Sequence, residues 1–308
     1  MAVAETSIRP DRIALGIVFI LLSTFFTSLQ DAILKYASAD LNLWQIYVLR
    51  SVFLIPALLI IAFLWGDGAA TWRQSWRLWP MVRAALFVLM YFSLYSAIPV
   101  LPLSAVAAGV YTAPLFVAGL SALLLGEPVR LRGWFAIALG FAGVLLILRP
   151  GTEAFTWLML LPVMAGFFYA LSSIATRSRC RSIPPATLAL SMSFALLLTG
   201  AVVSVALYIG QPAPSQVAGS PFLLGSWGAP GLPEWGFVAI LAALMVANGL
   251  VLPAAYQSAP SVIIATFDYC YLIFATLFGF IVFAEIPDRQ TVIGMLMIAG
   301  AGLTVTLG

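Results

Sequence analysis

The chain contains no histidine among its 308 residues, and it contains only two cysteines. The lack of histidine excludes general base catalysis by imidazole, histidine-bound metals and Ser-His nucleophilic dyads. The cysteines, Cys180 and Cys270, lie in a basic loop and in an apolar segment, so no disulfide framework is implied. We therefore expect no catalytic residues, no metal site and no cofactor.

Charge is also scarce, because only 8% of the residues are charged whereas 63% are hydrophobic. A soluble domain carries roughly a quarter charged residues. With a mean hydropathy of +1.09, a soluble core could not hide the apolar surface, so the solvent must be lipid. The net charge of +3 is too small to predict nucleic-acid binding. The composition therefore predicts an integral membrane protein.

Long apolar runs fill most of the chain. A helix that spans a bilayer needs about 20 mostly apolar residues. Because the runs are continuous and do not alternate between apolar and polar residues, they predict helices and exclude a barrel. The expected fold class is all-α, with ten transmembrane helices at 13–35, 43–65, 79–98, 104–125, 133–148, 156–176, 186–209, 235–257, 261–284 and 291–307.

The basic residues set the predicted orientation, since Lys and Arg gather at the cytoplasmic ends of membrane helices. With the N-terminus in the cytoplasm, ten of the 14 basic residues fall at cytoplasmic ends, Arg83 among them. An even number of helices then puts the C-terminus in the cytoplasm as well. We expect a multi-pass protein of a bacterial-type inner (plasma) membrane. Residues 210–234 would face outside, as an ordinary loop or as a mobile lid.

Two stretches of the chain repeat the same order of features. Residues 95–148 carry Tyr95, Ser104, Glu127-Pro128 and then a glycine-bearing helix, and residues 256–306 carry Tyr256, Ser261, Glu285-x-Pro287 and then another. This pattern predicts two five-helix repeats, 1–150 and 151–308. Since five is odd, the second repeat enters the membrane from the opposite face. Transporters use such inverted repeats for alternating access around a site at the bilayer midplane.

With these motifs the chain resembles the drug/metabolite transporter superfamily, in its ten-helix branch with two tandem five-helix repeats. The resemblance is carried by Glu127-Pro128, Glu285-x-Pro287, Tyr95, Tyr256 and the closing helices around Gly140 and Gly300. The chain departs from the family at Leu272, opposite Pro114, where the family often has proline. The resemblance implies two inverted repeats around a central cavity. The aromatic residues of that presumed cavity are similar to those of bacterial exporters of aromatic and other hydrophobic amino acids.

Aromatic and polar side chains within the predicted helices are the candidate substrate-binding residues. Aromatic stripes are often plain packing, but tyrosine hydroxyls in lipid need a partner, and rings from three helices suit a cavity that stacks an indole or phenyl group. Asn248 precedes Gly249, with Pro253 a turn later, which predicts a locally opened backbone; hydrogen bonding between helices is the alternative. The candidates are Phe87, Tyr91, Tyr95, Tyr111, Phe168, Tyr169, Asn248, Asp268 and Gln30.

Few charged residues lie at membrane depth, where a charge costs roughly 2.5–3.5 kcal/mol on insertion scales. Asp268 either pairs with a substrate ammonium or takes up a proton, or it bonds to Asn248 or a nearby tyrosine. Asp31 and Arg50 are predicted to form a structural ion pair; alternatively, Arg50 holds a substrate carboxylate. Small residues four apart, as around Gly109, predict close helix packing within a monomer or at the interface of a homodimer.

The predicted function is export of small hydrophobic or aromatic metabolites, amino acids in particular, by alternating access. A sugar-phosphate or nucleotide-sugar carrier of the same superfamily would need Lys or Arg inside its cavity, and only Arg50 is a candidate. A gated pore is another alternative. An intramembrane enzyme would need a histidine or a second deep aspartate beside Asp268, so the chain is not expected to be an enzyme. The expected partners are a small-molecule substrate and the lipid bilayer.

Overall fold

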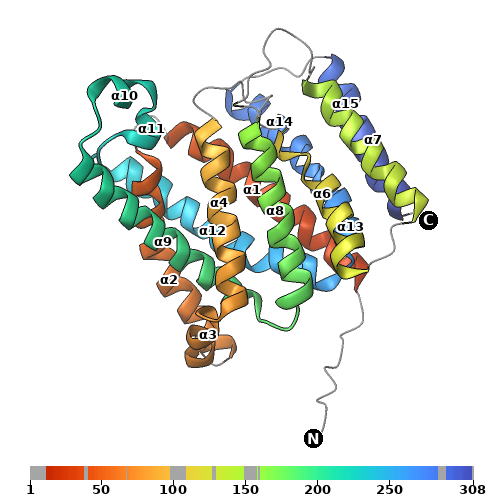
Figure 1. Ribbon diagram of the computed structural model, residues 1–308, viewed down its shortest axis with the longest axis horizontal. Coiled ribbons are helices and arrows are strands. Elements are labelled where there is room, and N and C mark those ends of the chain that lie inside the picture. The colour runs from red at the N-terminus through yellow and green to blue at the C-terminus, as the bar shows by residue number, and fades with distance from the viewer. Residues whose placement is uncertain are drawn as a thin grey trace, which may run out of the picture.

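The computed structural model describes residues 12–37, 41–66, 68–97, 109–126, 130–148, 158, 160–283 and 289–306, and the regular structure in these ranges is helical (Figure 1). Seven spans are long and apolar enough to cross a membrane. They are α1 (Ile13–Ala37), α2 (Leu43–Trp65), α4 (Leu78–Ala97), α8 (Leu160–Arg179), α9 (Pro185–Gly210), α12 (Leu232–Ser258) and the consecutive helices α13 (Ser261–Asp268) and α14 (Cys270–Phe283). The protein is therefore a polytopic membrane protein.

Shorter helices occupy the remaining predicted segments. They are α6 (Ala113–Leu120), which continues into the π-helix η1 (Ser121–Leu125), α7 (Leu131–Leu148) and α15 (Arg289–Thr306). Each of the ten predicted segments thus overlaps a helix in the described ranges, while ten crossings in two inverted repeats stays a prediction. Three short helices were not predicted: α3 (Gly68–Ser75), α10 (Pro214–Gly219) and α11 (Pro221–Leu224). The repeat motif residues Glu127, Pro128, Glu285 and Pro287 lie outside the described residues.

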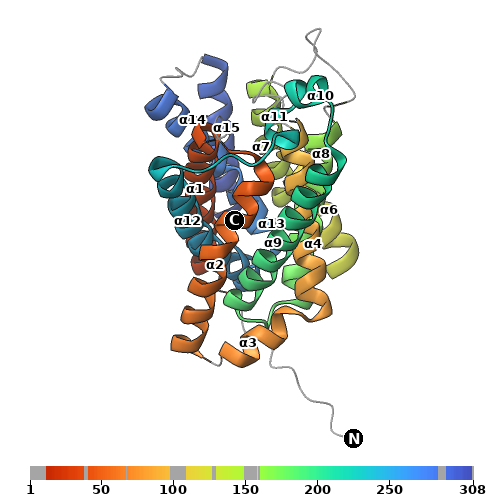
Figure 2. The ribbon, with the colours of Figure 1, turned by 90° about the vertical axis from the view of Figure 1, so that its left-hand side faces the viewer.

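Eight helical segments pack side by side in a closed ring. In order around the ring, α1 contacts α12, α12 contacts α2, α2 contacts α9, α9 contacts α4, α4 contacts α8, α8 contacts α6, α6 contacts α13, and α13 contacts α1 again. α7 and α15 pack mainly against each other at one side of the ring (Figure 1). Figure 2 is turned so that α2 and α9 face the viewer. The interior of the ring is therefore lined by helices from both halves of the chain.

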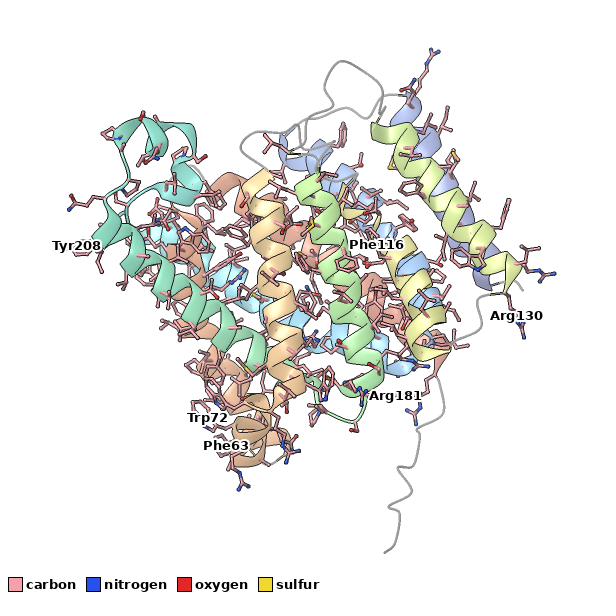
Figure 3. The ribbon with its side chains drawn as sticks, in the orientation of Figure 1. Phe63, Trp72, Phe116, Arg130, Arg181 and Tyr208 are labelled. Atoms are coloured by element: carbon pink, nitrogen blue, oxygen red, sulfur yellow. The ribbon has the colours of Figure 1, made fainter. Side chains whose placement is uncertain are left out.

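The outside of the ring is apolar, and its interior holds polar side chains among the apolar ones. On outer faces, Ile60 is 59% exposed, Leu64 75% and Leu124 62%, and Tyr208 points away from the bundle (Figure 3). Many buried side chains, in contrast, are polar or charged: Ser23, Thr24, Ser28, Gln30, Gln45, Arg50, Ser51, Arg83, Ser172, Ser173, Thr176, Ser191, Ser193 and Asn248. Large apolar side chains exposed over the outer face, with polar ones buried inside, are what lipid as the solvent predicts.

An irregular turn occurs in each half of the chain, just before α6 and between α13 and α14. The N–H of Thr112 bonds to the carbonyl oxygen of Gly109 at 3.2 Å just before α6, and the N–H of Leu272 bonds to that of Tyr269 at 3.0 Å between α13 and α14. These bonds span three residues, a tighter pattern than the four of an α-helix. The rings of Tyr111 and Tyr269 lie 6.1 Å apart, so the two irregular turns meet inside the ring.

Glycines bring α6 and α8 together. A Cβ atom on Gly166 would lie 2.8 Å from the carbonyl oxygen of Val110 and 3.0 Å from Oγ1 of Thr112, and one on Gly109 would collide with Pro162. Real Cβ atoms do not approach so closely, so these contacts require glycine. The close packing that the sequence predicts around Gly109 is confirmed, and it occurs within one chain.

The connection between α9 and α12 folds over the beginning of α2. Nε1 of Trp44 donates to the carbonyl oxygen of Leu223 at 2.7 Å. Nε2 of Gln45 donates to the carbonyl oxygen of Gly228 at 2.7 Å, and Oε1 of Gln45 accepts from the N–H of Gly228 at 3.1 Å. Residues 211–231 are thus anchored by side chains of α2, and they contain two short helices where the sequence predicts a loop.

One end of the ring carries tryptophan and arginine side chains. Trp72 of α3 and Arg181, after α8, lie at the lower end in Figure 3, and Arg130 lies at the beginning of α7. α10 and α11 lie at the opposite end from α3 (Figure 1). An end rich in tryptophan and arginine is typical of a membrane interface. Its assignment to the cytoplasmic side stays a prediction.

Candidate functional site

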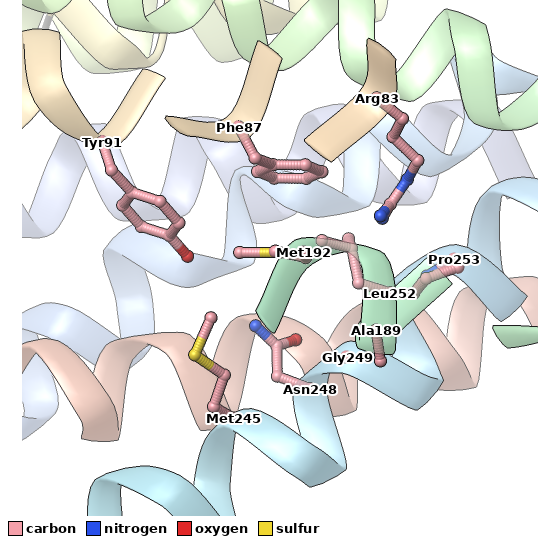
Figure 4. Close-up of a pocket in the computed structure, with 10 residues that line it drawn as sticks. All are labelled: Arg83, Phe87, Tyr91, Ala189, Met192, Met245, Asn248, Gly249, Leu252 and Pro253. Atoms are coloured by element: carbon pink, nitrogen blue, oxygen red, sulfur yellow. The ribbon is translucent and has the colours of Figure 1, made fainter. Parts of the chain in front are cut away.

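A small cavity lies inside the ring, between α4, α9 and α12 (Figure 4). Its free volume is about 20 Å³, which is room for about one water molecule. A metabolite would fit only after the surrounding helices move apart. The lining residues are Arg83, Phe87 and Tyr91 of α4, Ala189 and Met192 of α9, and Met245, Asn248, Gly249, Leu252 and Pro253 of α12.

An aromatic stripe on α4 runs along this cavity and beyond it. The rings of Phe87 and Tyr91 lie 6.4 Å apart, and those of Tyr91 and Tyr95 are stacked at 5.8 Å with an interplanar angle of 8°. Phe222 of α11 packs edge-on against Tyr95 at 6.1 Å. Phe87 and Tyr91 therefore line the cavity, while Tyr95 extends the stripe to the segment that folds over α2, and substrate binding by the three stays a prediction.

Asp268 does not line the cavity, and Tyr169 lies between the two. The hydroxyl of Tyr169 on α8 lies near the carboxyl group of Asp268. The ring of Tyr169 packs edge-on against Phe87 at 6.1 Å and against Tyr256 at 6.4 Å. Asp268 therefore lies one side chain away from the cavity wall. In the described part of the chain, no group of three or more His, Cys, Asp or Glu side chains could hold a metal ion.

Two further candidates lie away from this cavity. The ring of Tyr111, in the turn before α6, packs against Tyr271 of α14 at 5.3 Å. The hydroxyl of Tyr271 donates to Oδ2 of Asp31 on α1 at 2.7 Å. Phe168 packs against Phe167 at 6.1 Å. Tyr111 and Phe168 are thus part of the packed interior between helices and do not line the described cavity.

The side chain of Asn248 joins α12 to α1 at the edge of the cavity. Its Oδ1 accepts a hydrogen bond from Oγ of Ser23 at 2.6 Å, and its Nδ2 donates to Oγ1 of Thr27 at 2.9 Å. Hydrogen bonding between helices therefore occupies much of this amide. Gln30, one turn after Thr27 on α1, is only 2% exposed, and its Oε1 has no hydrogen-bond partner among the described residues.

Arg50 on α2 lies buried beside a tyrosine. It is 3% exposed, and its guanidinium carbon lies 5.6 Å from the centroid of the Tyr47 ring. Neither Nε of Arg50 nor the hydroxyl of Tyr47 has a hydrogen-bond partner among the described side chains and backbone. The charge of Arg50 acts on Asp31 through space, and the ion pair between them stays a prediction.

Arg83 is the charged residue of the cavity wall, and the sequence candidates did not include it. The basic-residue count placed it at a cytoplasmic helix end, but it is 2% exposed and lines the cavity. Its Nε donates to Oγ1 of Thr176 at 2.7 Å, and its guanidinium carbon lies 4.8 Å from the centroid of the Phe87 ring. The available signal was its spacing, because a residue four positions before Phe87 shares a helix face with it.

Comparisons with known proteins confirm the resemblance to a drug/metabolite transporter family. Residues 14–149 match the EamA-like transporter family. The chain is 27% identical over 307 residues to the riboflavin transporter of Rhizobium johnstonii, covering 97% of this chain and 93% of that protein. It is 24% identical over 303 residues to the pseudopaline exporter of Pseudomonas aeruginosa, with 96% and 97% covered. It is also 24% identical over 295 residues to the S-adenosylmethionine uptake transporter of Rickettsia bellii, with 95% and 93% covered.

A protein of known crystal structure has the same fold. Its TM-score is 0.71 at 18% sequence identity, and the superposition covers 96% of each chain. This likeness concerns the fold alone. The curated relatives above are named as transporters or as an exporter, which agrees with a transport role.

Proposed function

We propose that this chain is a carrier that moves a small organic solute with an aromatic ring across the membrane by alternating access. The observation that carries the proposal is the cavity enclosed by helices of both halves, with Phe87 and Tyr91 on its wall. Aromatic side chains offer flat surfaces on which a ring can stack. A ring of helices that encloses an aromatic cavity suits a carrier better than a membrane protein with a purely structural role.

The pairing of the helices supports the two-repeat arrangement on which alternating access depends. The corresponding helices of the two repeats are α1 and α8, α2 and α9, α4 and α12, α6 and α13, and α7 and α15. When each helix is replaced by its counterpart, the contact of α1 with α12 becomes the contact of α8 with α4. In the same way, the contact of α2 with α12 becomes the contact of α9 with α4. The contacts of α2 with α9, α6 with α13 and α7 with α15 map onto themselves. Such exchange is the pattern expected of repeats 1–150 and 151–308 around one axis.

The size of the cavity requires motion. A free volume of about 20 Å³ does not hold a metabolite, so the solute would enter when α4, α9 and α12 separate at one end and leave when they separate at the other. The turns at Tyr111 and Tyr269 interrupt the α-helical hydrogen-bond pattern and support bending at these positions. Irregular backbone in transporter helices commonly borders the transport site.

The relatives support an aromatic solute but not amino acids in particular. Their names give riboflavin, pseudopaline and S-adenosylmethionine as the solutes, and riboflavin and S-adenosylmethionine carry flat heteroaromatic rings. Phenylalanine and tryptophan also meet the requirement for a ring and stay within the proposal. The names include one exporter and uptake transporters, so export, which the sequence predicts, needs a direct assay.

Counterflow into proteoliposomes tests the proposal. The purified protein is reconstituted with unlabelled riboflavin, tryptophan or phenylalanine inside, and uptake of the same labelled compound from outside is measured. We expect accumulation above that of empty vesicles for at least one compound. Phe87→Leu should reduce it, whereas Phe135→Leu, at a side chain that is 62% exposed on an outer face, should not. Absence of counterflow for all three compounds would refute the proposed solute class.

A further inference from the structure

We propose that Arg83 is the anion-binding residue of the cavity, so that the transported solute joins an aromatic ring to an oxyanion, either a carboxylate or a phosphate. The inference rests on the proposed carrier function and narrows its substrate class. Arg83 lies on the same face of α4 as Phe87 and Tyr91, and all three line the cavity (Figure 4).

The first support is a buried charge without a counter-ion. A guanidinium stays protonated in proteins, and a charge at bilayer depth is unfavourable unless it faces a partner or water. The titratable groups of the described chain that act on Arg83 are Cys180, Tyr169 and Tyr91. None of them is a carboxyl group. The cavity wall therefore carries a net positive charge at Arg83.

The second support is the set of N–H groups that Arg83 has left. A guanidinium has five N–H donors. Nε uses one on Oγ1 of Thr176 at 2.7 Å, and Nη1 points one at the carbonyl oxygen of Leu188 over a long 3.5 Å. The structure gives no hydrogen-bond acceptor for the other three among the described residues. Two parallel N–H groups of a guanidinium match the two oxygens of a carboxylate or phosphate.

The third support is that the guanidinium group of Arg83 is held in place. Thr176 anchors Nε from α8, and the Phe87 ring lies 4.8 Å from the guanidinium carbon. Thr176 is itself fixed, since its hydroxyl donates to the carbonyl oxygen of Ser172 at 2.8 Å. A fixed guanidinium loses little freedom when it binds an oxyanion. An anionic group at Arg83 would leave the rest of the solute beside Phe87 and Tyr91.

This arrangement changes one exclusion made from the sequence. A carrier of phosphorylated solutes needs a basic side chain inside its cavity, and the sequence offered only Arg50 for that position. Arg83 supplies one at the cavity wall. Organic phosphates and carboxylates with an aromatic ring therefore belong to the same proposed substrate class.

Matched pairs of compounds test the inference by binding to the purified full-length protein, measured by equilibrium dialysis. One pair is flavin mononucleotide and riboflavin, which differ by a phosphate. The other is indole-3-acetate and indole-3-acetamide, which differ by the charge of a carboxylate. We expect the protein to prefer the anionic member of at least one pair by about 10-fold to 100-fold, the range for hydrogen bonds to a charged group. Arg83→Gln should remove that preference, and Arg83→Lys should restore part of it.

The control is Arg73→Gln, which removes the same charge from an exposed position on α3 and should keep the preference. If Arg83→Gln does not fold, Thr176→Val still decides, because it retains the guanidinium charge but removes the anchor of Nε. It should reduce the anion preference at least threefold while binding of the neutral member stays unchanged. The inference would be overturned if the unaltered protein bound the two members of each pair equally. It would also be overturned if the unaltered protein bound none of the four compounds. An unchanged preference in Arg83→Gln or in Thr176→Val would overturn it as well.

The outcome is separable from that of the proposed function. Counterflow of a ring compound without any anion preference would sustain the carrier and refute the role of Arg83. Anion preference without counterflow would support anion binding by Arg83 and refute the carrier function.

Discussion

The hydrogen bonds of Asn248 give the most quantitative prediction, because they join helices from opposite halves of the chain. Asn248 accepts from Oγ of Ser23 at 2.6 Å and donates to Oγ1 of Thr27 at 2.9 Å. Asn248 and Ser23 are 8% and 3% exposed, so water competes little for either bond. We expect the pair Ser23–Asn248 to contribute measurable coupling to the free energy of unfolding.

The magnitude follows from what the partners do when they are separated. Interhelical hydrogen bonds in membrane proteins average about 0.6 kcal/mol and reach about 1.7 kcal/mol in double-mutant cycles. The short 2.6 Å bond of Ser23 belongs in the upper part of this range. After Asn248→Ala, the hydroxyl of Ser23 can turn to a carbonyl oxygen of its own helix, which limits the loss. We therefore predict a coupling energy of about 1 kcal/mol.

The assay is a double-mutant cycle of Ser23→Ala, Asn248→Ala and the double variant. Unfolding of the protein in mixed micelles is followed by circular dichroism during titration with sodium dodecyl sulfate. A second cycle with Thr27→Val should give a smaller coupling, since its bond is longer. Additive effects of Ser23→Ala and Asn248→Ala, within about 0.3 kcal/mol, would show that this contact does not stabilise the pairing of α1 with α12.

Three further predictions concern packing, the outer segment and proton coupling. Gly166→Ala should destabilise the protein by about 1–3 kcal/mol, because the new Cβ atom forces α6 away from α8. The control Gly236→Ala should have no such effect, since no atom lies within 4 Å of its new Cβ. Equal effects of the two substitutions on stability would contradict the close contact at Gly166. Gln45→Leu should speed hydrogen exchange of the Gly228 amide, because it removes both bonds between Gln45 and Gly228, and unchanged exchange would mean that these two bonds do not hold this part of the segment. Asp268→Asn should abolish any dependence of counterflow on a pH gradient, and a gradient effect that survives would make Asp268 a packing residue.

The helices could be predicted because lipid imposes one simple rule on the sequence. Each spanning segment needs a long apolar run, so α2 and α9 follow their predicted ranges to within one residue at each end. The irregular turn at Tyr269 could not be predicted, since no proline or glycine adjoins it and apolar runs do not report hydrogen-bond register. The anchoring of residues 211–231 was equally hidden, because it depends on Trp44 and Gln45, which are far away in sequence.

The candidate site could be predicted in part. Phe87 and Tyr91 were found because residues four apart share a helix face, and both line the cavity. Arg83 has the same four-residue spacing from Phe87, but the rule that basic residues mark membrane surfaces placed it at the cytoplasmic end of its helix. Whether an arginine near a helix end points along the surface or into the interior depends on neighbouring helices, here α8 and α9. That information is tertiary, and only the assembled ring supplies it.

The central claim, that one cavity opens in turn to both faces of the membrane, is tested most directly by labelling Ala189→Cys in a background of Cys180→Ala and Cys270→Ala. Ala189 is 5% exposed and lines the cavity. A membrane-impermeant maleimide is applied to right-side-out and to inside-out vesicles. Labelling from each face, slowed by a transported solute on either side, is the predicted result. Labelling from one face only, whether or not solute is present, would contradict alternating access at this cavity.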